Sequence, residues 1–341
     1  MTTVPFEPCA LTVGNFDGVH LGHQALCAAA VRYAEAHRIV SAALTFHPHP
    51  TVVIAPERTP QMICALPQRI ALLKAAGIRE VYILPFTPAI AKLSPREFAS
   101  EFLRDRWHSR AVFVGENFRF GHRQSGTPQT LAALGAEYGF QVEIVPPVSY
   151  RGEIISSSTI RRYLASGNVS RAARLLGRCF SIEGSVVSGH GVGARQTVPT
   201  LNLLPPAGQI VPRGVYITET REPSTARRWQ SITNCGVRPT FGGDQFTIET
   251  FLLTPLQGPA PTRIEVLFHR FVRHERQFPS PDALKSQIMR DVSRAQTWWR
   301  RLSMQAETAF RVQPKLDHNR IDGEPNPEGD AKELVEGQMG Q

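Results

Sequence analysis

The 341-residue sequence has few cysteines, and no two of them form a Cys-x-x-Cys pair. An odd number without such pairs argues against a disulfide scaffold and carries no zinc-site signature. We expect reduced, mostly packed thiols, as is typical of a cytoplasmic protein. The five residues are Cys9, Cys27, Cys64, Cys179 and Cys235.

Long apolar runs are also missing. No stretch approaches the roughly 20 apolar residues that a membrane-spanning helix needs. The first residues show neither the basic region nor the apolar segment of a secretion signal. We therefore expect no membrane contact and a cytoplasmic location.

Basic residues are plentiful, but they form no lysine- or arginine-rich tract and no repeat with aromatic residues. The formal net charge is +9, which suits phosphorylated ligands and also permits nucleic-acid binding. Because the arginines are dispersed, we expect small phosphorylated ligands and no nucleic acid. A chain of this length accommodates two domains with separate cores.

Up to about residue 177, short apolar runs alternate with helical patterns. Helix starts lie between the runs: Ser94-Pro95-Arg96-Glu97 has the pattern of a capping box, and Thr127-Pro128 is a second cap. This order predicts a parallel, doubly wound sheet with its ligand site at the carboxyl ends of the strands. The runs, which are apolar on both faces as strands covered on each side must be, are 10–13, 40–46, 81–85, 111–115 and 141–146.

The most informative motif follows the first run. Residues 14–23, Gly-Asn-Phe-Asp-Gly-Val-His-Leu-Gly-His, join a strand to a helical stretch over 24–37. Turn amides and a helix N-terminus attract anions, and His20 and His23 can donate to phosphoryl oxygens while Gly22 lets the backbone close in. The pattern is of the HxGH class and predicts nucleotide chemistry.

Two simpler interpretations of the histidines compete with a nucleotide site: they could be a metal-ligand pair or two surface histidines. A metal site needs further ligands. The other close histidine pair, His47 and His49, alternates with Pro48 and Pro50. We interpret it as a rigid turn near the site; a role as metal ligands is the less favoured alternative.

Two later segments of the same region add polar groups. Residues 155–161, Ile-Ser-Ser-Ser-Thr-Ile-Arg, open a helix. Serines at such a position usually serve as caps, but here their hydroxyls, the free amides and Arg161 could also hold triphosphate oxygens. Asn117 follows the fourth run and offers a donor and an acceptor to a sugar or a flavin ring. Phe118 and Phe120 could be core residues or ring contacts, and the core is favoured.

From about residue 177 to 278 the pattern changes to short alternating runs separated by Gly, Pro and Asp. This spacing indicates an antiparallel barrel or sandwich. The runs are 180–187, 214–220, 230–234, 247–253 and 263–271. A helix is expected after Ser280-Pro281, and an apolar stripe that packs against the barrel is formed by Leu284, Ile288, Val292 and Ala295. Beyond about residue 305 a polar, net acidic composition predicts a flexible tail.

The barrel region has its own candidate residues. Gly191 and Gly193 stand in a glycine-rich loop of a kind that cradles phosphates, although Gly-x-Gly more often marks a tight turn. Thr200 supplies a hydroxyl and Asn202 a neutral oxygen, which both suit a Mg²⁺ ion whose other ligands are waters and ATP phosphates. Glu249 is the single acid of an apolar strand. Such a residue usually faces solvent; in an inward position it could accept the proton of an attacking hydroxyl.

The three polar segments of the first region, in this order, resemble the FAD synthetase module of the bacterial bifunctional riboflavin kinase/FAD synthetases, over about residues 10–178. The resemblance implies adenylyl transfer, in which the phosphate of FMN attacks the α-phosphate of ATP and pyrophosphate leaves without a covalent enzyme intermediate. His20 and His23 then donate to the phosphates, and the leaving pyrophosphate is steadied by Ser157, Thr159 and Arg161.

The barrel region resembles the riboflavin kinase module of the same family. This resemblance implies that Thr200 and Asn202 bind MgATP, that Glu249 is the catalytic base toward the ribityl 5′-hydroxyl, and that Arg273 lies beside the flavin. The chain departs from the family at residues 194–198, Ala-Arg-Gln-Thr-Val, where a basic residue followed by Leu-Gly-Phe is usual.

We therefore predict an α/β plus β protein. Residues 1–178 form a Rossmann-like nucleotidyltransferase sheet with helices, residues 179–305 form an antiparallel β-barrel kinase domain with a terminal helix, and residues 306–341 form the tail. The expected ligands are ATP, riboflavin, FMN, FAD and Mg²⁺, bound by a monomer or weak homo-oligomer. The residues expected to be catalytic are His20, His23, Arg161 and Glu249. Thr200 and Asn202 are expected to bind the metal. The residues expected to contact the other ligands are Gly14, Phe16, Asp17, Gly22, Asn117, Ser157, Ser158, Thr159, Gly191, Gly193, Thr200, Asn202 and Arg273.

Three alternatives stay open. Because of the departure at 194–198, the chain could be an FAD synthetase with a weakened kinase. It could also be another HxGH nucleotidylyltransferase, acting on pantetheine phosphate or choline phosphate and fused to a β-barrel binding module; the kinase-like residues of the barrel argue against this. A non-enzymatic nucleic-acid-binding protein needs a continuous arginine or aromatic face, which the sequence lacks.

Overall fold

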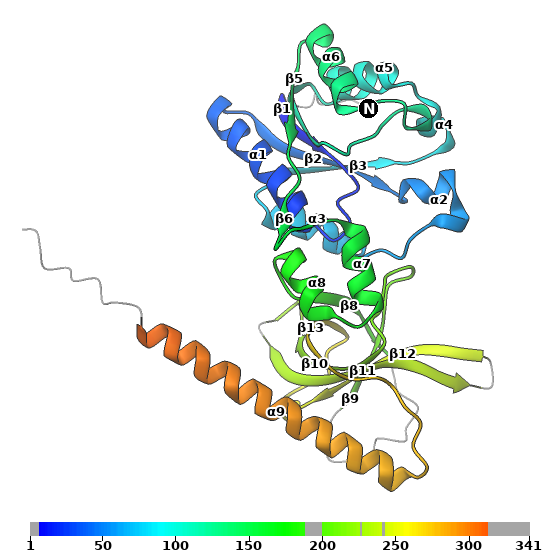
Figure 1. Ribbon diagram of the computed structural model, residues 1–341, viewed down its shortest axis with the longest axis vertical. Helices are drawn as coiled ribbons and strands as arrows, with labels where there is room; N and C mark the ends of the chain where they lie inside the picture. Colours follow the sequence, from blue (N-terminus) through cyan, green and yellow to red (C-terminus); the bar gives the residue numbers. More distant parts are fainter. Residues whose placement is uncertain (1–6, 188–199, 226, 241–242, 313–341) are drawn as a thin grey trace, which may run out of the picture. The chain divides into compact units, whose positions relative to one another are not determined.

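The computed structural model describes residues 7–187, 200–225, 227–240 and 243–312, and Figure 1 shows the course of the chain. The chain divides into two compact units, residues 1–296 and 297–341. The amino-terminal part of the first unit contains, in chain order, β1 (Cys9–Val13), α1 (Leu21–His37), β2 (Val40–His47), α2 (Pro50–Ile54), η1 (Pro56–Arg58), α3 (Leu66–Ala75), β3 (Glu80–Pro85), α4 (Pro88–Lys92), α5 (Pro95–Glu97), the π-helix η2 (Phe98–Arg106), β4 (Ser109–Gly115), η3 (His122–Gln124), α6 (Pro128–Tyr138), β5 (Gln141–Val145), β6 (Ser149–Tyr150), β7 (Glu153–Ile154), α7 (Ser157–Ala165) and α8 (Val169–Leu176).

Five of these strands form one parallel sheet in the order β3-β2-β1-β4-β5. The chain moves outward from β1 to β3 and then returns to the other side of β1, so the strand order reverses between β1 and β4. In sheets of this class, ligands bind in the crevice at the carboxyl ends of the strands where the order reverses. The predicted doubly wound sheet is confirmed, and the HxGH motif lies at the carboxyl end of β1.

The sheet separates two apolar cores, because alternate residues of a strand point to opposite faces. Leu11 and Val112 pack on one face with residues of η2 and α6. Ala10 and Phe113 pack on the other face with residues of α1 and α3. Figure 1 shows α6 on one side of the sheet and α1 and α3 on the other.

The two outer strands differ from the expectation that all five runs are covered on both sides. In β3 only Leu84 is buried, and no residue of β5, all of which the structure describes, is fully buried. Each of these strands has a neighbouring strand on one side only, so part of its surface stays accessible. The prediction of two buried faces is correct for β1, β2 and β4 and wrong for β3 and β5.

Helix starts agree with the capping patterns of the sequence. Ser94 and Glu97 form the expected capping box, with Pro95 at the first helical position. The hydroxyl of Thr127 accepts the N–H of Thr130 at the start of α6. Helix α1 begins at Leu21, three residues before the expected start, so the HxGH motif itself forms its first turn.

The strands that follow α8 form a closed antiparallel barrel, as expected. Its strands are β8 (Phe180–Val187), β9 (Thr200–Leu204), β10 (Gly214–Arg221), β11 (Arg228–Thr240), β12 (Gly243–Leu252) and β13 (Arg263–Arg273). They pair in the order β10-β11-β12-β9-β8-β13, and the barrel closes because β13 also pairs with β10. The sequence pattern does not predict the short strand β9.

The terminal helix α9 (Pro281–Val312) departs from the sequence prediction in two ways. Leu284, the first residue of the expected apolar stripe, is 42% exposed, whereas Ala295 is fully buried. The helix also continues seven residues beyond residue 305, because its composition turns polar before its backbone leaves the helical conformation. The predicted domain boundaries at residues 178 and 305 stay predictions.

None of the helices that the structure describes is long and apolar enough to cross a membrane. All five cysteines are free thiols, and four of them are buried, which agrees with the expected packed thiols. Burial raises the pKa of Cys9 and of Cys27 to about 12.

Candidate active sites

The turn between β1 and α1 holds unusual backbone conformations. Phe16 and Val19 have φ of 48° and 39° although neither is glycine, and both side chains are buried. Gly18 has φ of 82°, and a Cβ at this position would lie 2.9 Å from Cγ2 of Ile63. Left-handed conformations are costly for bulky residues and occur where surrounding contacts fix them, often at functional sites.

The two histidines of the motif lie against each other at the start of α1. His20 is the N-cap, and its Nδ1 accepts the backbone N–H of His23 at 3.3 Å. The two rings stack with centroids 3.6 Å apart. A Cβ at Gly22 would lie 3.1 Å from Cε1 of His20, so this arrangement depends on glycine. Because Nδ1 of His20 accepts, its neutral ring carries the proton on Nε2.

Both imidazoles are neutral near pH 7. Burial lowers the pKa of His20 from its usual value to about 4; Asp17 opposes this shift, and Arg178 and Arg161 add to it. Burial also lowers the pKa of His23, with smaller contributions from His20, Arg69 and Arg161. Each ring therefore has one N–H to donate and is no source of positive charge.

Asp17 is buried and uses its carboxylate inside the protein. Its oxygens accept the backbone N–H groups of Ile63 and Cys64 at 2.9–3.2 Å. Oδ2 also pairs with the guanidinium of Arg161 at 2.6 Å. Arg161 donates through Nε to the carbonyl of Gln61 at 2.9 Å. This network holds the guanidinium of Arg161 next to the HxGH turn.

The start of α7 is attached to the same turn. The hydroxyl of Ser157 donates to the carbonyl of Asp17 at 2.9 Å, while Ser156 is the N-cap and accepts the N–H of Thr159 at 3.2 Å. The capping role expected of this serine cluster therefore belongs to Ser156. Ser158 is exposed. The N-terminus of a second helix, with its partial positive charge, thus lies close to the histidines.

A clamp outside the motif fixes the carbonyls of the turn. Arg178, in the segment between α8 and β8, donates to the carbonyls of Gly18 at 2.7 Å and Val19 at 3.3 Å. Gln24 donates to the carbonyls of Val19 and Leu176, both at 3.0 Å. These bonds hold the strained turn, and the sequence reading missed both residues.

Asn117 lies on the other side of the crevice. It follows β4, and a Cβ at Gly115 would lie 3.2 Å from its Oδ1. Phe118 and Phe120 stack with ring centroids 5.5 Å apart. Phe120 is buried in the core, as expected, and Phe118 packs against that core. Gly14, on the β1 side, sits where a Cβ would meet the ring of Phe16 at 3.3 Å.

In the barrel, strand pairing brings the predicted kinase residues together. Asn202 of β9 lies opposite Glu249 of β12, and Thr200 lies opposite Phe251. Since residues two apart share a face and paired residues lie side by side, Thr200, Asn202 and Glu249 lie on one face of the barrel wall. All three are half-buried.

That face is the outer one. Glu249 alternates with Ile248 and Thr250, which are fully buried, and the hydroxyl of Thr250 contacts other barrel hydroxyls on the opposite side of the wall. The inward position considered for Glu249 is therefore wrong. On the outer face, Asn234 of β11 is the next residue in the row, opposite Glu249. The sequence pattern does not predict that Asn234 lies beside Glu249, because this neighbourhood depends on the strand register.

Arg273 ends β13 and is fixed by α9. Its Nε pairs with Asp291 at 2.8 Å, and its guanidinium lies 5.6 Å from the ring centroid of Phe278. A cavity of about 430 Å³ is lined by Phe278 together with Arg276 and Arg290. This cavity offers an aromatic face and positive charge. Gly191, Gly193 and the stretch 194–198 lie outside the described residues.

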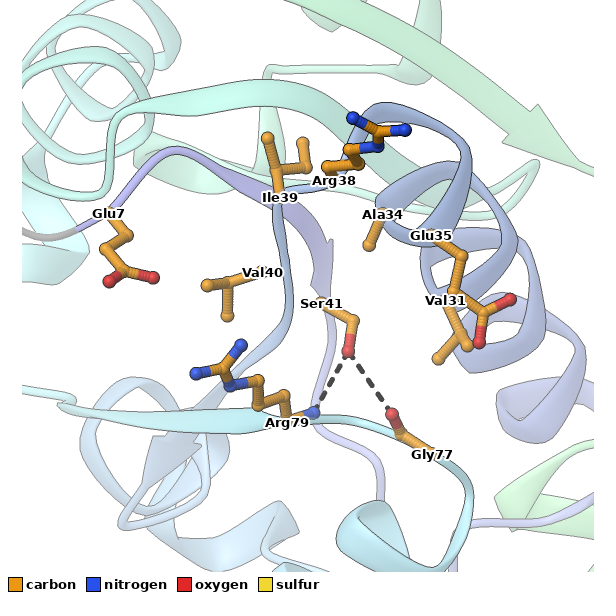
Figure 2. Close-up of a pocket in the computed structure, with 10 residues that line it drawn as sticks. All are labelled: Glu7, Val31, Ala34, Glu35, Arg38, Ile39, Val40, Ser41, Gly77 and Arg79. Carbon is orange, nitrogen blue, oxygen red and sulfur yellow. Dashed lines mark hydrogen bonds between the residues drawn. The ribbon is translucent and has the colours of Figure 1, made fainter.

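A second cavity of about 370 Å³ lies elsewhere (Figure 2). It is lined by Ser41 and Arg79, near the starts of β2 and β3, and by Glu35 near the end of α1. These are the amino ends of the strands, opposite to the HxGH motif. Within the described residues, no group of three or more His, Cys, Asp or Glu side chains is placed to hold a metal ion.

Comparisons with known proteins match both parts of the chain. A family model described as FAD synthetase matches residues 4–159, and one described as riboflavin kinase matches residues 176–299. The bifunctional riboflavin kinase/FMN adenylyltransferase of Escherichia coli is 32% identical over 85% of this chain and 93% of its own length. The protein of the same name from Pseudomonas fluorescens is 34% identical over 84% of this chain and 92% of its own. The chain belongs to this family.

The riboflavin kinase/FMN adenylyltransferase family thus accounts for both halves of the chain: the parallel sheet with the HxGH turn and the barrel with the Glu249 row. This is the architecture of an enzyme that combines kinase and nucleotidyltransferase activities. A crystal structure titled macrolide-efflux protein, from Streptococcus pneumoniae, is similar with a TM-score of 0.77 and 27% identity, covering 85% of this chain and 95% of that one.

Proposed function

We propose that the chain phosphorylates riboflavin to FMN at the barrel site and adenylylates FMN to FAD at the sheet site, with ATP as the second substrate of both steps. The observation that carries the proposal is the presence of two separate sets of polar residues on two folds. One set surrounds the HxGH turn at the strand-order reversal, and the other forms the Thr200–Asn202–Glu249 face. Each set matches the chemistry of one step.

At the sheet site, a phosphate oxygen of FMN attacks the α-phosphorus of ATP. A P–O bond forms there, and the bond to the β-phosphate oxygen breaks with its electron pair leaving on pyrophosphate. His20, whose proton sits on Nε2, donates a hydrogen bond to the phosphoryl oxygens as charge develops, and His23 assists it. Arg161, held by Asp17, and the N-terminus of α7 with Ser157 and Thr159 stabilise the leaving pyrophosphate.

Other residues of the turn shape this site. Gly14 and Gly22 keep space for the backbone and for the stacked imidazoles, and Phe16 packs beneath His23, with ring centroids 5.2 Å apart. Asn117 contacts a sugar or ring of the substrates across the crevice. Asp17 acts as a positioning residue, because the protein already occupies its carboxylate oxygens.

At the barrel site, Glu249 accepts the proton of the ribityl 5′-hydroxyl as that oxygen attacks the γ-phosphate of ATP. Thr200 and Asn202 offer a hydroxyl and an amide oxygen beside this carboxylate, a donor set of hard oxygens that fits Mg²⁺. The ion, when bound, neutralises charge on the ATP phosphates. Arg273 lies at the edge of the flavin, near the cavity that contains Phe278.

The direct experiment is to incubate the purified protein with riboflavin and MgATP and to separate the flavins by chromatography over time. The proposal predicts FMN first and FAD later. FAD from added FMN without any phosphorylation of riboflavin would support the weakened-kinase alternative. Nucleotidylation of pantetheine phosphate or choline phosphate, with no flavin product, would contradict the proposal.

A further inference from the structure

Arg69 of α3 is an almost fully buried cation at the carboxyl edge of the sheet. Only 3% of the residue is exposed. One terminal nitrogen lies 3.3 Å from Oγ1 of Thr45 and 3.4 Å from the carbonyl of Phe46, both at the end of β2. Its Nε is buried without a hydrogen-bond partner. These contacts leave most of the guanidinium's donors for another acceptor.

Among the residues that the structure describes, no carboxylate neutralises this charge. Arg69 forms no ion pair with any residue in the described ranges, and the buried Asp17 is already paired with Arg161 at 2.6 Å. An arginine cannot lose its proton in a protein, and a buried charge is unfavourable unless an opposite charge accompanies it. The arrangement is complete only when an anion enters from outside the protein.

The position of Arg69 is within the HxGH site. The hydroxyl of Thr45, which Arg69 approaches, donates to the carbonyl of Asn15 in the HxGH turn at 3.1 Å. His23, the last residue of the HxGH motif, has a buried Nδ1 that also has no partner. Burial lowers the pKa of His49 most, and the charges of Arg161 and Arg69 add to this shift.

The sheet topology indicates which anion Arg69 meets. Ligands of such sheets bind at the reversal between β1 and β4, and we assign ATP to this place because the HxGH turn, Arg161 and the N-terminus of α7 meet there. Arg69 contacts β2, on the opposite side of β1 from β4. Resting on the function proposed above, we propose that Arg69 binds the phosphate of the FMN that accepts the adenylyl group. Its planar fork suits a phosphate monoester, to which it donates hydrogen bonds without giving or taking a proton.

The test compares Arg69→Met and Arg69→Lys with Arg79→Met. Arg79 is an exposed arginine at the opposite edge of the same sheet, so its variant is the matched control. We expect Arg69→Met to raise KM for FMN in FAD formation roughly 10- to 100-fold, the usual worth of charge-assisted hydrogen bonds. KM for ATP should change less than about threefold. The KM for FMN of Arg69→Lys should lie between those of the wild type and Arg69→Met, since lysine keeps the charge but lacks the planar fork of donors.

An unchanged KM for FMN, or an equal or larger rise in KM for ATP, would overturn the assignment. The wild-type protein is assayed first with FMN and ATP. If it forms no FAD, the proposed function fails; if it does, the variants test Arg69 alone.

A second readout separates ligand binding from a structural role. Without ligand, Arg69→Met should unfold at the same urea concentration as wild type or higher, because it removes an uncompensated buried charge. FMN should then protect the wild type against unfolding more than it protects Arg69→Met. Both proteins keep the barrel site, which therefore contributes equally to the two. A strongly destabilised Arg69→Met that Arg69→Lys restores, with equal protection by FMN, would make Arg69 a structural residue.

Discussion

The two sites of this chain are held in place to different degrees. In the sheet site, His20 is buried and capped on α1, Asp17 and Arg161 are paired, and Arg178 fixes the carbonyls of the turn. In the barrel site, Asn202 and Glu249 are half-buried on the outer wall and brought together by strand register. The sheet site is preorganised before substrate binds, so substitutions of positioning residues should damage it. In the barrel site we expect the chemical groups themselves to matter most.

The largest effect is expected at Glu249. Glu249→Gln keeps the shape of the side chain but cannot accept a proton, so riboflavin phosphorylation should fall roughly 10²- to 10⁴-fold. FAD formation from added FMN should not change, because the sheet site has its own groups. ADP release with riboflavin, beside flavin fluorescence quenching for binding, measures this. Glu183→Gln, on another barrel strand and paired with Arg263, is the control. Near-normal turnover of Glu249→Gln would remove Glu249 from the mechanism.

His20 should show the reverse selectivity. His20→Asn keeps a side chain that can cap α1 but loses the Nε2 donor, so FAD formation from FMN should fall on the order of 10²- to 10³-fold. Riboflavin phosphorylation should persist. His37→Asn, at the exposed end of the same helix, is the control and should retain both activities. Equal loss of both activities in a folded His20→Asn variant would contradict the separation of the sites.

Asp17 tests whether the sheet site depends on positioning residues, because its carboxylate acts through Arg161. Asp17→Asn leaves the guanidinium without its counter-charge, and breaking a buried pair should lower the free energy of unfolding by about 3 kcal/mol. FAD formation should decrease while kinase activity is retained under conditions where the variant is folded. Asp105→Asn, which breaks the exposed pair with Arg104, should cost less than about 1 kcal/mol. Urea unfolding of both variants measures the difference; equal costs would mean that Asp17 is not a positioning residue.

The pH dependence of stability gives the smallest effect. The pKa of His20 is about 4 in the folded protein and near 6.5 when unfolded. Above pH 6.5 both states are neutral; as the pH falls from 6.5 toward 4, the unfolded state takes up the proton first, so stability is lost. The free energy of unfolding of His20→Asn should fall less between pH 7 and pH 4 than that of the wild type, by on the order of 2–3 kcal/mol. Urea titrations at pH 7 and 4 measure it, and parallel curves would contradict the buried neutral imidazole.

Much of the fold could be read from the sequence, because buried strands produce apolar runs and helix starts have local signals. The strand over 40–46, the capping box at Ser94 and the HxGH turn are of this kind. Contacts distant in sequence left no such signal: the bonds of Arg178 to the turn and the position of Asn234 beside Glu249 depend on the folded topology. A weak indication for Arg69 is present in the sequence. This residue stands four positions before the buried Leu73 in the same helix, and residues four apart lie on one face of a helix, here the apolar face.

The burial of β3 and β5 was overestimated for a related reason. Their apolar runs resemble those of the central strands, and position in the sheet decides how much of each is covered. The face of Glu249 was likewise undecided by its apolar neighbours, since Ile248 on the inner face and Phe251 on the outer face are both apolar. Register settled it, because Ile248 and Thr250 are fully buried on the other side.

The central claim is that one chain carries two independent sites, and mixing two variants that each lack one of the two activities tests it most directly. Glu249→Gln and His20→Asn are each incubated with riboflavin and MgATP, first alone and then together, and the flavins are separated. The account predicts almost no product from Glu249→Gln, accumulated FMN from His20→Asn, and FAD from the mixture, because FMN made by one variant diffuses to the intact sheet site of the other. A mixture of folded variants that makes no FAD, although His20→Asn still releases FMN, would contradict it.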